Sequence, residues 1–158
     1  MHVREAIVAD ADAMGEVLEE LVAAGQRTSR ADPDFVRSHY LNHPHRLHCF
    51  VGLDERGTIL GFQSLKRADE SNPYGTPIGW GIIGTHVRPS AARRGVGAAL
   101  FAATVVSARE ADLPAIEAYI GEANAAALQY YEALGFGTYR TRAGIICKSF
   151  QISSRSAA

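Results

Sequence analysis

The sequence predicts a mixed α/β fold: a central twisted, mixed β-sheet of six to seven strands with helices on both faces. Two observations carry this prediction. In the second half, helical and strand-forming segments alternate, which favours crossover connections, whereas in the first half residues 47–53 and 58–66 flank a turn and form a hairpin. The 158 residues correspond to one domain. We therefore expect a single domain over residues 1–152 and a flexible tail over 153–158.

The N-terminal half begins with a predicted strand over residues 2–8. Asp10 or Asp12 could cap the following helix, because a carboxylate oxygen can accept from the first-turn N–H groups. That helix has apolar residues at helical spacing and ends at Gly25, and a second short helix covers about 34–41. The hairpin comes next, and residues 67–77, with Pro73, Gly75 and Pro77, form a loop.

The C-terminal half continues with a strand over residues 78–87 and a helix over 95–110. In this helix we expect Val96, Leu100, Ala103 and Val106 to share one apolar face. A strand over 115–120, a helix over 124–134 closed by Gly135, and a strand pair over 136–141 and 144–152 complete the order β-α-α-β-β-β-α-β-α-β-β.

The charge balance excludes some classes of binding protein. Sixteen Lys and Arg stand against 17 Asp and Glu, for a net charge of −1, so we expect no general binding to nucleic acid or to a membrane surface. The charge is unevenly distributed, however. Between Ser71 and Arg109 there is no acidic residue, and four arginines (Arg88, Arg93, Arg94 and Arg109) give that segment a local charge of +4.

Cysteine usage and the N-terminus indicate the compartment. Cys49 and Cys147 lie in apolar runs and read as buried strand cysteines rather than as a disulfide framework or a zinc site. The N-terminus lacks the apolar block of a signal peptide, and no apolar run reaches the roughly 18 residues of a membrane span. We therefore expect a cytoplasmic protein.

The turn before the helix over 95–110 carries the first functional pattern, Arg93-Arg94-Gly95-Val96-Gly97-Ala98. A helix N-terminus presents unpaired N–H groups and a partial positive charge, the glycines would let a ligand approach the backbone, and the arginines add charge. This chemistry suits a pyrophosphate. Alternatively, the glycines simply permit a tight turn and close packing. Two other phosphate motifs fail on spacing: a dinucleotide fingerprint needs Gly or Ala where Leu100 stands, and a triphosphatase loop needs Lys-Ser/Thr where Ala98-Ala99 stand.

A second pattern follows in residues 124–136: Asn124, Ala127, Tyr131, Gly135 and Phe136, spaced as Asn-x-x-Ala-x-x-x-Tyr-x-x-x-Gly-Phe. With these two patterns in this order, the chain resembles the GCN5-related N-acetyltransferase superfamily. That family pairs such a helix with a [Gln/Arg]-x-x-Gly-x-[Gly/Ala] pyrophosphate loop. The glycines match, whereas Ala92 stands at the usual Gln/Arg position, which Arg93 and Arg94 could compensate. The resemblance covers nearly the whole chain and implies the acyl-CoA N-acyltransferase fold.

The resemblance also implies roles for individual residues. Acetyl-CoA would be the donor and no metal would take part. The amides from Arg93 through Arg94, Gly95, Val96 and Gly97 to Ala98 would hold its pyrophosphate, and the backbone of Thr85, His86 and Val87 would pair with its pantetheine arm and polarise the thioester carbonyl. Asn124 would hold the arm from the other side. Tyr131 matches the general acid that protonates the leaving thiolate, although it could instead be a core aromatic beside Leu128 and Leu134.

The general base and the acceptor site remain open at this stage. The strand over 78–87 contains no carboxylate; His86, Glu117 and Glu122 are candidates, or the amine could lose its proton to water. The run Tyr74 to Trp80 and the residues Tyr139, Arg140 and Arg142 could wall the acceptor site. His39, His43, His45 and His48 cluster in sequence, but their spacing across a helix end, Pro44 and a strand start makes a shared metal site improbable.

The function that the resemblance implies is transfer of an acetyl group to a primary amine of a small molecule by direct attack in a ternary complex. Two alternatives remain: a protein or peptide acceptor, and a non-catalytic acyl-CoA sensor. By analogy with relatives, a homodimer is possible.

Overall fold

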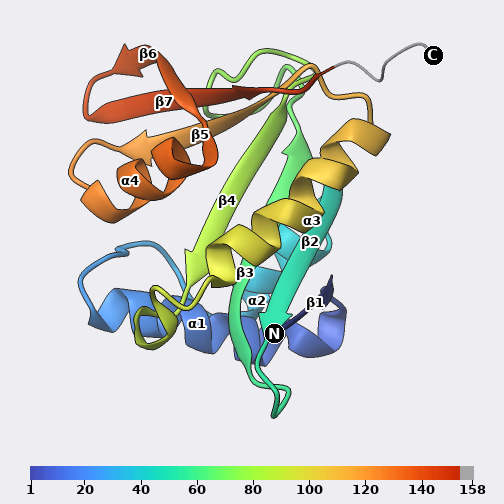
Figure 1. Cartoon of the computed structure of the whole chain (residues 1–158), viewed down its shortest axis with the longest axis vertical. Coiled ribbons are helices and arrows are strands. Elements are labelled where there is room, and N and C mark those ends of the chain that lie inside the picture. The colour runs from blue at the N-terminus through green and yellow to red at the C-terminus, as the bar shows by residue number, and fades with distance from the viewer. Residues whose placement is uncertain (154–158) are drawn as a thin grey trace.

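The computed structural model describes residues 1–153, so residues 154–158 of the predicted tail lie outside the described part (Figure 1). The predicted order of elements is confirmed. The strands are β1 (His2–Glu5), β2 (Arg46–Leu53), β3 (Ile59–Arg67), β4 (Gly81–Val87), β5 (Ala115–Gly121), β6 (Gly137–Arg142) and β7 (Ile145–Gln151). The helices are α1 (Ala11–Ala23), α2 (Pro33–Val36), α3 (Val96–Glu110) and α4 (Ala125–Leu134), with single turns at η1 (Val8–Asp10), η2 (Arg37–Leu41) and η3 (Pro89–Ala91).

All seven strands form one mixed sheet in the order β1-β2-β3-β4-β5-β7-β6. Every neighbouring pair is antiparallel except β4 and β5, which are parallel. This parallel pairing is short, because it joins only Gly81–Ile116, Ile82–Glu117 and Ile83–Ala118. Beyond Ile83 and Ala118 the two strands diverge, and Figure 1 shows the resulting split in the middle of the sheet.

Helices cover both faces of the sheet, as predicted. On one face α1 and α2 cover a cluster of fully buried residues that includes Met14, Leu18, Val51 and Phe62. On the other face α3 and α4 pack over Leu65, Ile116 and Phe136, among others. Because side chains alternate along a strand, each position in β4 and β5 is assigned to one of these two faces. This alternation decides which residues meet in the split.

The first and fourth strands are shorter than predicted. β1 ends at Glu5 because the Asp10 carboxylate pairs with Arg4 at 2.8 Å and accepts from the Ile7 N–H at 2.8 Å, which folds the chain into a turn. Asp10 precedes α1 but makes no side-chain cap, contrary to the prediction. β4 begins at Gly81 rather than at residue 78, because Gly79 has a φ of +88° and turns the chain.

Two helical predictions also needed correction. The second helix divides into α2 and a π-type turn, η2, over Arg37–Leu41. In α3 the buried face is set by Val96, Leu100, Phe101, Thr104, Ser107 and Ala108. Val106 was expected on this face, but it is 50% exposed. Within residues 1–153, no helix combines the length and apolar character that crossing a bilayer requires.

Candidate active site

The split between β4 and β5 holds a tyrosine from α4. Tyr131 is 5% exposed, and its hydroxyl lies 2.8 Å from Oγ1 of Thr85, which belongs to the part of β4 beyond the parallel pairing. Burial raises the pKa of Tyr131 above its ordinary value of 10.0, so the phenol keeps its proton at physiological pH. The geometry therefore places a protonated hydroxyl at the split. Tyr131 also packs against Phe136, at 5.1 Å between ring centroids, so the catalytic and core interpretations of this residue are compatible.

A chain of hydrogen bonds connects Tyr131 to the start of α3. Nε2 of Gln63, a fully buried residue of β3, donates to Thr85 Oγ1 at 2.9 Å and to the Tyr130 hydroxyl at 3.0 Å. The Tyr130 hydroxyl donates in turn to the carbonyl oxygen of Gly97 at 2.8 Å. Tyr130 therefore fixes the first turn of α3, while its neighbour Tyr131 reaches the split. Sequence reasoning missed Gln63, because β3 mixes polar residues (Gln63, Ser64, Lys66 and Arg67) with apolar ones and nothing local distinguishes Gln63 from the others.

The N-terminus of α3 is open to a ligand. The N–H groups of Val96, Gly97 and Ala98 precede the first intrahelical bond, which joins Ala99 N to Gly95 O at 3.0 Å. Gly95 has a φ of +79°, and a Cβ there would meet nothing within 4 Å. Unpaired amides at an accessible helix start provide the positive end of a helix dipole, which suits the negative charge of a pyrophosphate.

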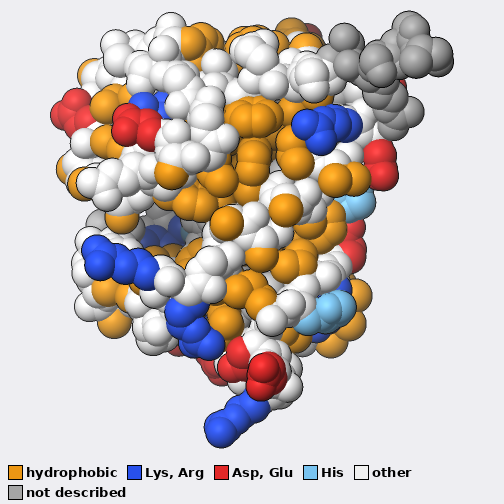
Figure 2. Space-filling model, in the orientation of Figure 1, with side chains coloured by type: hydrophobic (Ala, Val, Ile, Leu, Met, Phe, Trp, Pro, Cys, Tyr) orange, Lys and Arg blue, Asp and Glu red, His pale blue; other side chains and the backbone are white. Residues whose placement is uncertain are grey.

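Arg93 and Arg94, just before this turn, are exposed and form no ion pair within residues 1–153. Arg88, by contrast, donates to the carboxylates of Glu16 and Glu20 at 3.5 and 3.3 Å. Arg88 is therefore compensated within the fold, and the charge available to an anion comes from Arg93 and Arg94. On the face shown in Figure 2, Lys and Arg side chains border a hollow below α4.

The two glycines of the turn have different structural reasons. A Cβ on Gly97 would lie 2.5 Å from Cε1 of Tyr130, so the tyrosine ring occupies the space that a side chain would need. Gly97 is therefore required by packing, the alternative that the sequence left open. At position 95 glycine is required because the backbone has a positive φ, and the space where a Cβ would lie is empty.

Asn124 lies beyond the end of β5 and is the N-cap of α4. Its Oδ1 accepts from the N–H of Ala127 at 3.1 Å, which fixes the orientation of the amide. The structure thus shows Asn124 as a helix cap, and its contact with the donor stays a prediction.

His86 points to the opposite face of the sheet from Thr85. Its Nε2 lies 3.1 Å from the hydroxyl of Tyr40, and its ring packs on Phe62 at 4.8 Å between centroids. Burial lowers the pKa of His86 to about 3, so the imidazole is neutral at physiological pH and has little basicity to accept a proton from an ammonium group. The backbone of residues 84–87 pairs with β3 on one edge, while its other edge borders the split.

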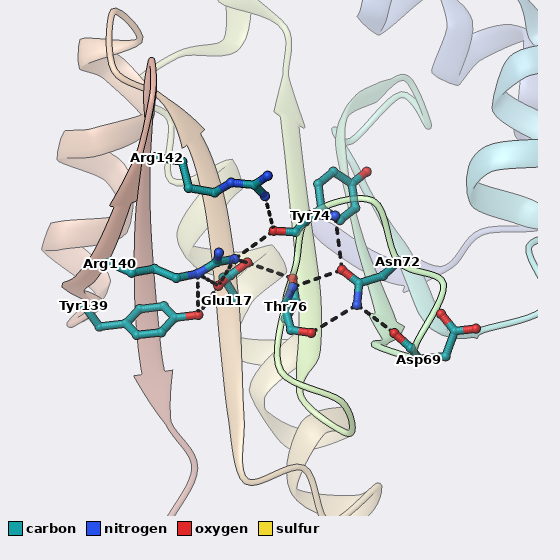
Figure 3. Close-up of polar contacts among 8 residues, drawn as sticks. All are labelled: Asp69, Asn72, Tyr74, Thr76, Glu117, Tyr139, Arg140 and Arg142. Atoms are coloured by element: carbon teal, nitrogen blue, oxygen red, sulfur yellow. Dashed lines mark hydrogen bonds and ion pairs between the residues drawn. The ribbon is translucent and has the colours of Figure 1, made fainter.

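Glu117 lies on the same face of the sheet as His86, and its carboxylate is bound by neighbouring side chains (Figure 3). It is 0% exposed, and both of its oxygens lie 2.9 Å from Nη2 of Arg140. Thr76 Oγ1 donates to it at 2.7 Å, and the Tyr139 hydroxyl donates to it as well. Because a guanidinium and two hydroxyls already bind both oxygens of the carboxylate, this arrangement does not favour Glu117 as the base. Glu122, the third candidate, is exposed.

The family follows from comparison with known proteins. Residues 15–136 match the acetyltransferase (GNAT) family. The chain belongs to this family. It is 37% identical over 94 residues to the mycothiol acetyltransferase of Propionibacterium freudenreichii subsp. shermanii, a match that covers 60% of this chain but only 29% of that protein.

Solved structures show the same fold. The phosphinothricin acetyltransferase of Sinorhizobium meliloti, solved in complex with acetyl-CoA, superposes with a TM-score of 0.76 at 21% identity, covering 99% of this chain and 91% of that chain. The ribosomal-protein-alanine N-acetyltransferase of Brucella melitensis superposes with a TM-score of 0.71 at 18% identity, covering 96% and 99%. The predicted acyl-CoA N-acyltransferase fold is therefore confirmed.

In this GNAT protein, the loop before β4 and the terminal strand pair meet; whether they wall an acceptor site stays a prediction. The carbonyl oxygen of Tyr74 accepts from Arg140 at 2.9 Å and from Arg142 at 2.8 Å (Figure 3). The loop is also braced internally, because Asn72 Oδ1 accepts from the N–H groups of Tyr74 and Thr76 at 3.1 and 3.0 Å. The position of this loop is therefore fixed by hydrogen bonds within the protein.

A cavity of about 350 Å³ lies between this loop, η2 and the sheet. Three of the clustered histidines, His39, His43 and His45, line it, whereas His48 pairs with Glu5 at 2.6 Å. Within residues 1–153, no group of three or more His, Cys, Asp or Glu side chains is arranged to hold a metal ion. The histidines therefore gather around a cavity rather than around an ion.

Proposed function

We propose that this GNAT protein transfers the acetyl group of acetyl-CoA to a primary amine of a small molecule. The observation that carries the proposal is the Tyr131 hydroxyl, buried and protonated, 2.8 Å from Thr85 at the mouth of the split. A buried phenol at this position can donate a proton, or a hydrogen bond, to a thiolate as negative charge develops on sulfur.

The donor site combines the split with the start of α3. Arg93, Arg94 and the amides of residues 95–98 suit the pyrophosphate, and the open edge of Thr85, His86 and Val87 suits the amide groups of a pantetheine arm. Asn124 would contact this arm from the β5 side. Binding of acetyl-CoA by a structural neighbour supports the assignment.

The chemical step follows from this placement. The nitrogen of a neutral amine attacks the thioester carbon, the C–N bond forms as the C–S bond breaks, and Tyr131 supplies a proton to the sulfur while the amine loses one. A backbone N–H at the open edge of β4 would stabilise the charge on the carbonyl oxygen. Since His86 is neutral and Glu117 is ion-paired, water that enters the cavity is the proton acceptor we favour.

A small acceptor is favoured over a protein by the cavity of about 350 Å³ on the face opposite Thr85, which falls within the range of small-molecule sites. A protein acceptor remains the second candidate, since the fold neighbour named for ribosomal-protein alanine acts on a protein.

The test is thiol release from acetyl-CoA with a panel of amines, for the wild type and Tyr131→Phe. We expect Tyr131→Phe to lower kcat by about 100-fold or more while the affinity for coenzyme A is kept. Tyr130→Phe is the matched comparison, because it removes a hydroxyl one residue away; its loss of kcat should be at least about tenfold smaller. Binding of coenzyme A without turnover of any amine would favour the sensor, and turnover of peptides alone would favour the protein acceptor.

A further inference from the structure

The cavity beside η2 contains a buried cation without a carboxylate partner. Lys66, on β3, lines the cavity and is 8% exposed. Within residues 1–153 it forms no ion pair, whereas Lys148, the other lysine of the chain, is 3% exposed and pairs with Glu132 at 2.8 Å. Buried ammonium groups are costly unless they are paired, so the isolated position of Lys66 calls for an explanation.

The surroundings of Lys66 leave its charge uncompensated. The ring of Tyr40 lies against it, with its centroid 5.5 Å from Nζ. Burial lowers the pKa of Lys66 to about 8, and no carboxylate opposes this shift. Asp69 also lines the cavity, but it binds His45 at 3.0 Å and Ser71 at 2.8 Å. The ammonium therefore remains available to an anion that enters the cavity.

The neighbouring histidines do not neutralise the charge of Lys66. Burial, followed by repulsion from Lys66, lowers the pKa of His39 to about 4 and also lowers the pKa of His43. Both rings are therefore neutral at physiological pH and can serve only as hydrogen-bonding partners. An acceptor in this cavity would meet the buried ammonium of Lys66, since the other charged lining residues are engaged elsewhere: Asp69 binds His45 and Ser71, and Arg67 donates to the carbonyl oxygen of Ala111 at 3.0 Å.

The cavity lies beside the site of the chemical step. Lys66 is paired in register with Ile82, which also lines the cavity and lies just before the point where β4 leaves β5. Four residues further along β4, on the same face, His86 contacts the hydroxyl of Tyr40 at 3.1 Å. The strand rise of about 3.3 Å per residue separates the levels of Ile82 and His86 by about 13 Å, and Tyr40 lies between them, because its ring centroid is 5.5 Å from Nζ of Lys66. The split itself begins just beyond Ile83, about 3–7 Å along the strand from Ile82, a distance that a small acceptor can span.

We propose that Lys66 binds a carboxylate of the acceptor, so that the substrate class is a primary amine that also carries a carboxylate, as free amino acids do. This inference rests on the proposed function, because it names the chemistry of the acceptor. The carboxylate replaces the missing partner of Lys66, and the amine of the same molecule points along β4 toward the split. Tyr74, whose backbone is fixed by Arg140 and Arg142, forms the opposite wall.

A binding experiment tests the inference without requiring turnover. Because the chain has two lysines, protein labelled with ¹⁵N and ¹³C at lysine and loaded with coenzyme A gives two side-chain signals, assigned with Lys148→Arg. The probes are amino acids and their decarboxylated counterparts: methionine with 3-methylthiopropylamine, arginine with agmatine, and phenylalanine with phenethylamine. We expect at least one amino acid to raise the pKa of Lys66 by about one to three units and to leave Lys148 unmoved. If no amino acid at millimolar concentration moves Lys66, or if a decarboxylated amine moves it equally, the inference is wrong.

A kinetic experiment uses the same pairs of probes. Loss of a charge-assisted bond in Lys66→Met should raise the KM of the amino acid by about 10- to 100-fold and leave the KM of its decarboxylated partner unchanged. Lys66→Arg should recover part of the affinity. Equal effects on both partners would overturn the inference, whereas absence of turnover with every amine would overturn the proposed function and leave the binding result to decide the role of Lys66.

Discussion

Replacing Glu117 by Gln removes the negative charge of a fully buried carboxylate that pairs with Arg140, and it retains the shape of the side chain. The variant loses attraction to Nε and Nη2 of Arg140, which lie 3.1 and 2.9 Å from Oε2, whereas Thr76 can still donate to an amide oxygen. Breaking a buried pair costs about 3–5 kcal/mol. Because the Arg140 side chain is 26% exposed and keeps some hydration, we expect the lower end, about 3 kcal/mol.

This loss in the free energy of unfolding can be measured by urea denaturation monitored by circular dichroism. With a slope of about 2 kcal/mol per molar urea, the midpoint should fall by about 1.5 M. The control is Asp34→Asn, which breaks an Arg–carboxylate pair with Arg37 at 2.6 Å whose side chains are 39% and 83% exposed, and it should cost at most about 0.5 kcal/mol.

The double variant Glu117→Gln/Arg140→Met completes the cycle. Because it leaves neither charge unpaired, it should be more stable than the sum of the single variants predicts. A fall of less than about 0.3 M for Glu117→Gln, or strict additivity, would refute the reasoning. Glu117→Gln should also leave the pH profile of kcat unchanged. If Glu117 were the catalytic base, the variant would lose the acidic limb of that profile.

Three further predictions concern the charges and glycines of the site. Since the folded-state pKa of Lys66, about 8, lies below its ordinary 10.5, the charged lysine costs stability at pH 7 and that cost disappears as pH rises to 10.5. Lys66→Met should therefore raise the free energy of unfolding by about 1–2 kcal/mol at pH 7, discounted for solvent screening, and by almost nothing at pH 10.5; an equal gain at both would contradict this. Gly97→Ala should lower stability by about 1–3 kcal/mol in thermal unfolding, because the Tyr130 ring must move, and an unchanged midpoint would exclude that packing. Arg93→Gln/Arg94→Gln should raise the KM for acetyl-CoA by about tenfold at low salt, less at high salt, with stability within about 0.5 kcal/mol of wild type.

Local patterns predicted the order of elements and the place of Tyr131. Gly95 and Gly135 both adopt a positive φ at a helix end, and a glycine in the sequence is enough to predict such a backbone conformation there. The buried face of α3 could not be predicted, because alanine and valine occur all round this helix and periodicity then cannot choose a side. Only packing on the sheet showed that Val106 faces outward.

The charged residues of the site depended on contacts between distant segments. Glu117 meets Arg140 because β5 pairs with β7 and β7 pairs with β6, a register that no local pattern defines. Lys66 stands near the end of a strand, where a lysine usually reaches solvent, and it is buried because Tyr40 from η2 covers it. Sequence reasoning therefore proposed a donor site from local motifs, and it missed the buried cation of the cavity, which depends on contacts between distant segments.

The split between β4 and β5 has a consequence for the solution behaviour of the protein. Strands with unpaired backbone edges are hazards, because a strand from another chain can add to them and start aggregation. Here the open edge of residues 84–87 lies inside the sheet, with β5, β7 and β6 continuing on the far side of the gap. A slender extended ligand can enter this space, but the edge of a second sheet cannot approach it. The fold thus exposes hydrogen-bonding backbone to a ligand while it keeps that backbone away from other copies of the chain.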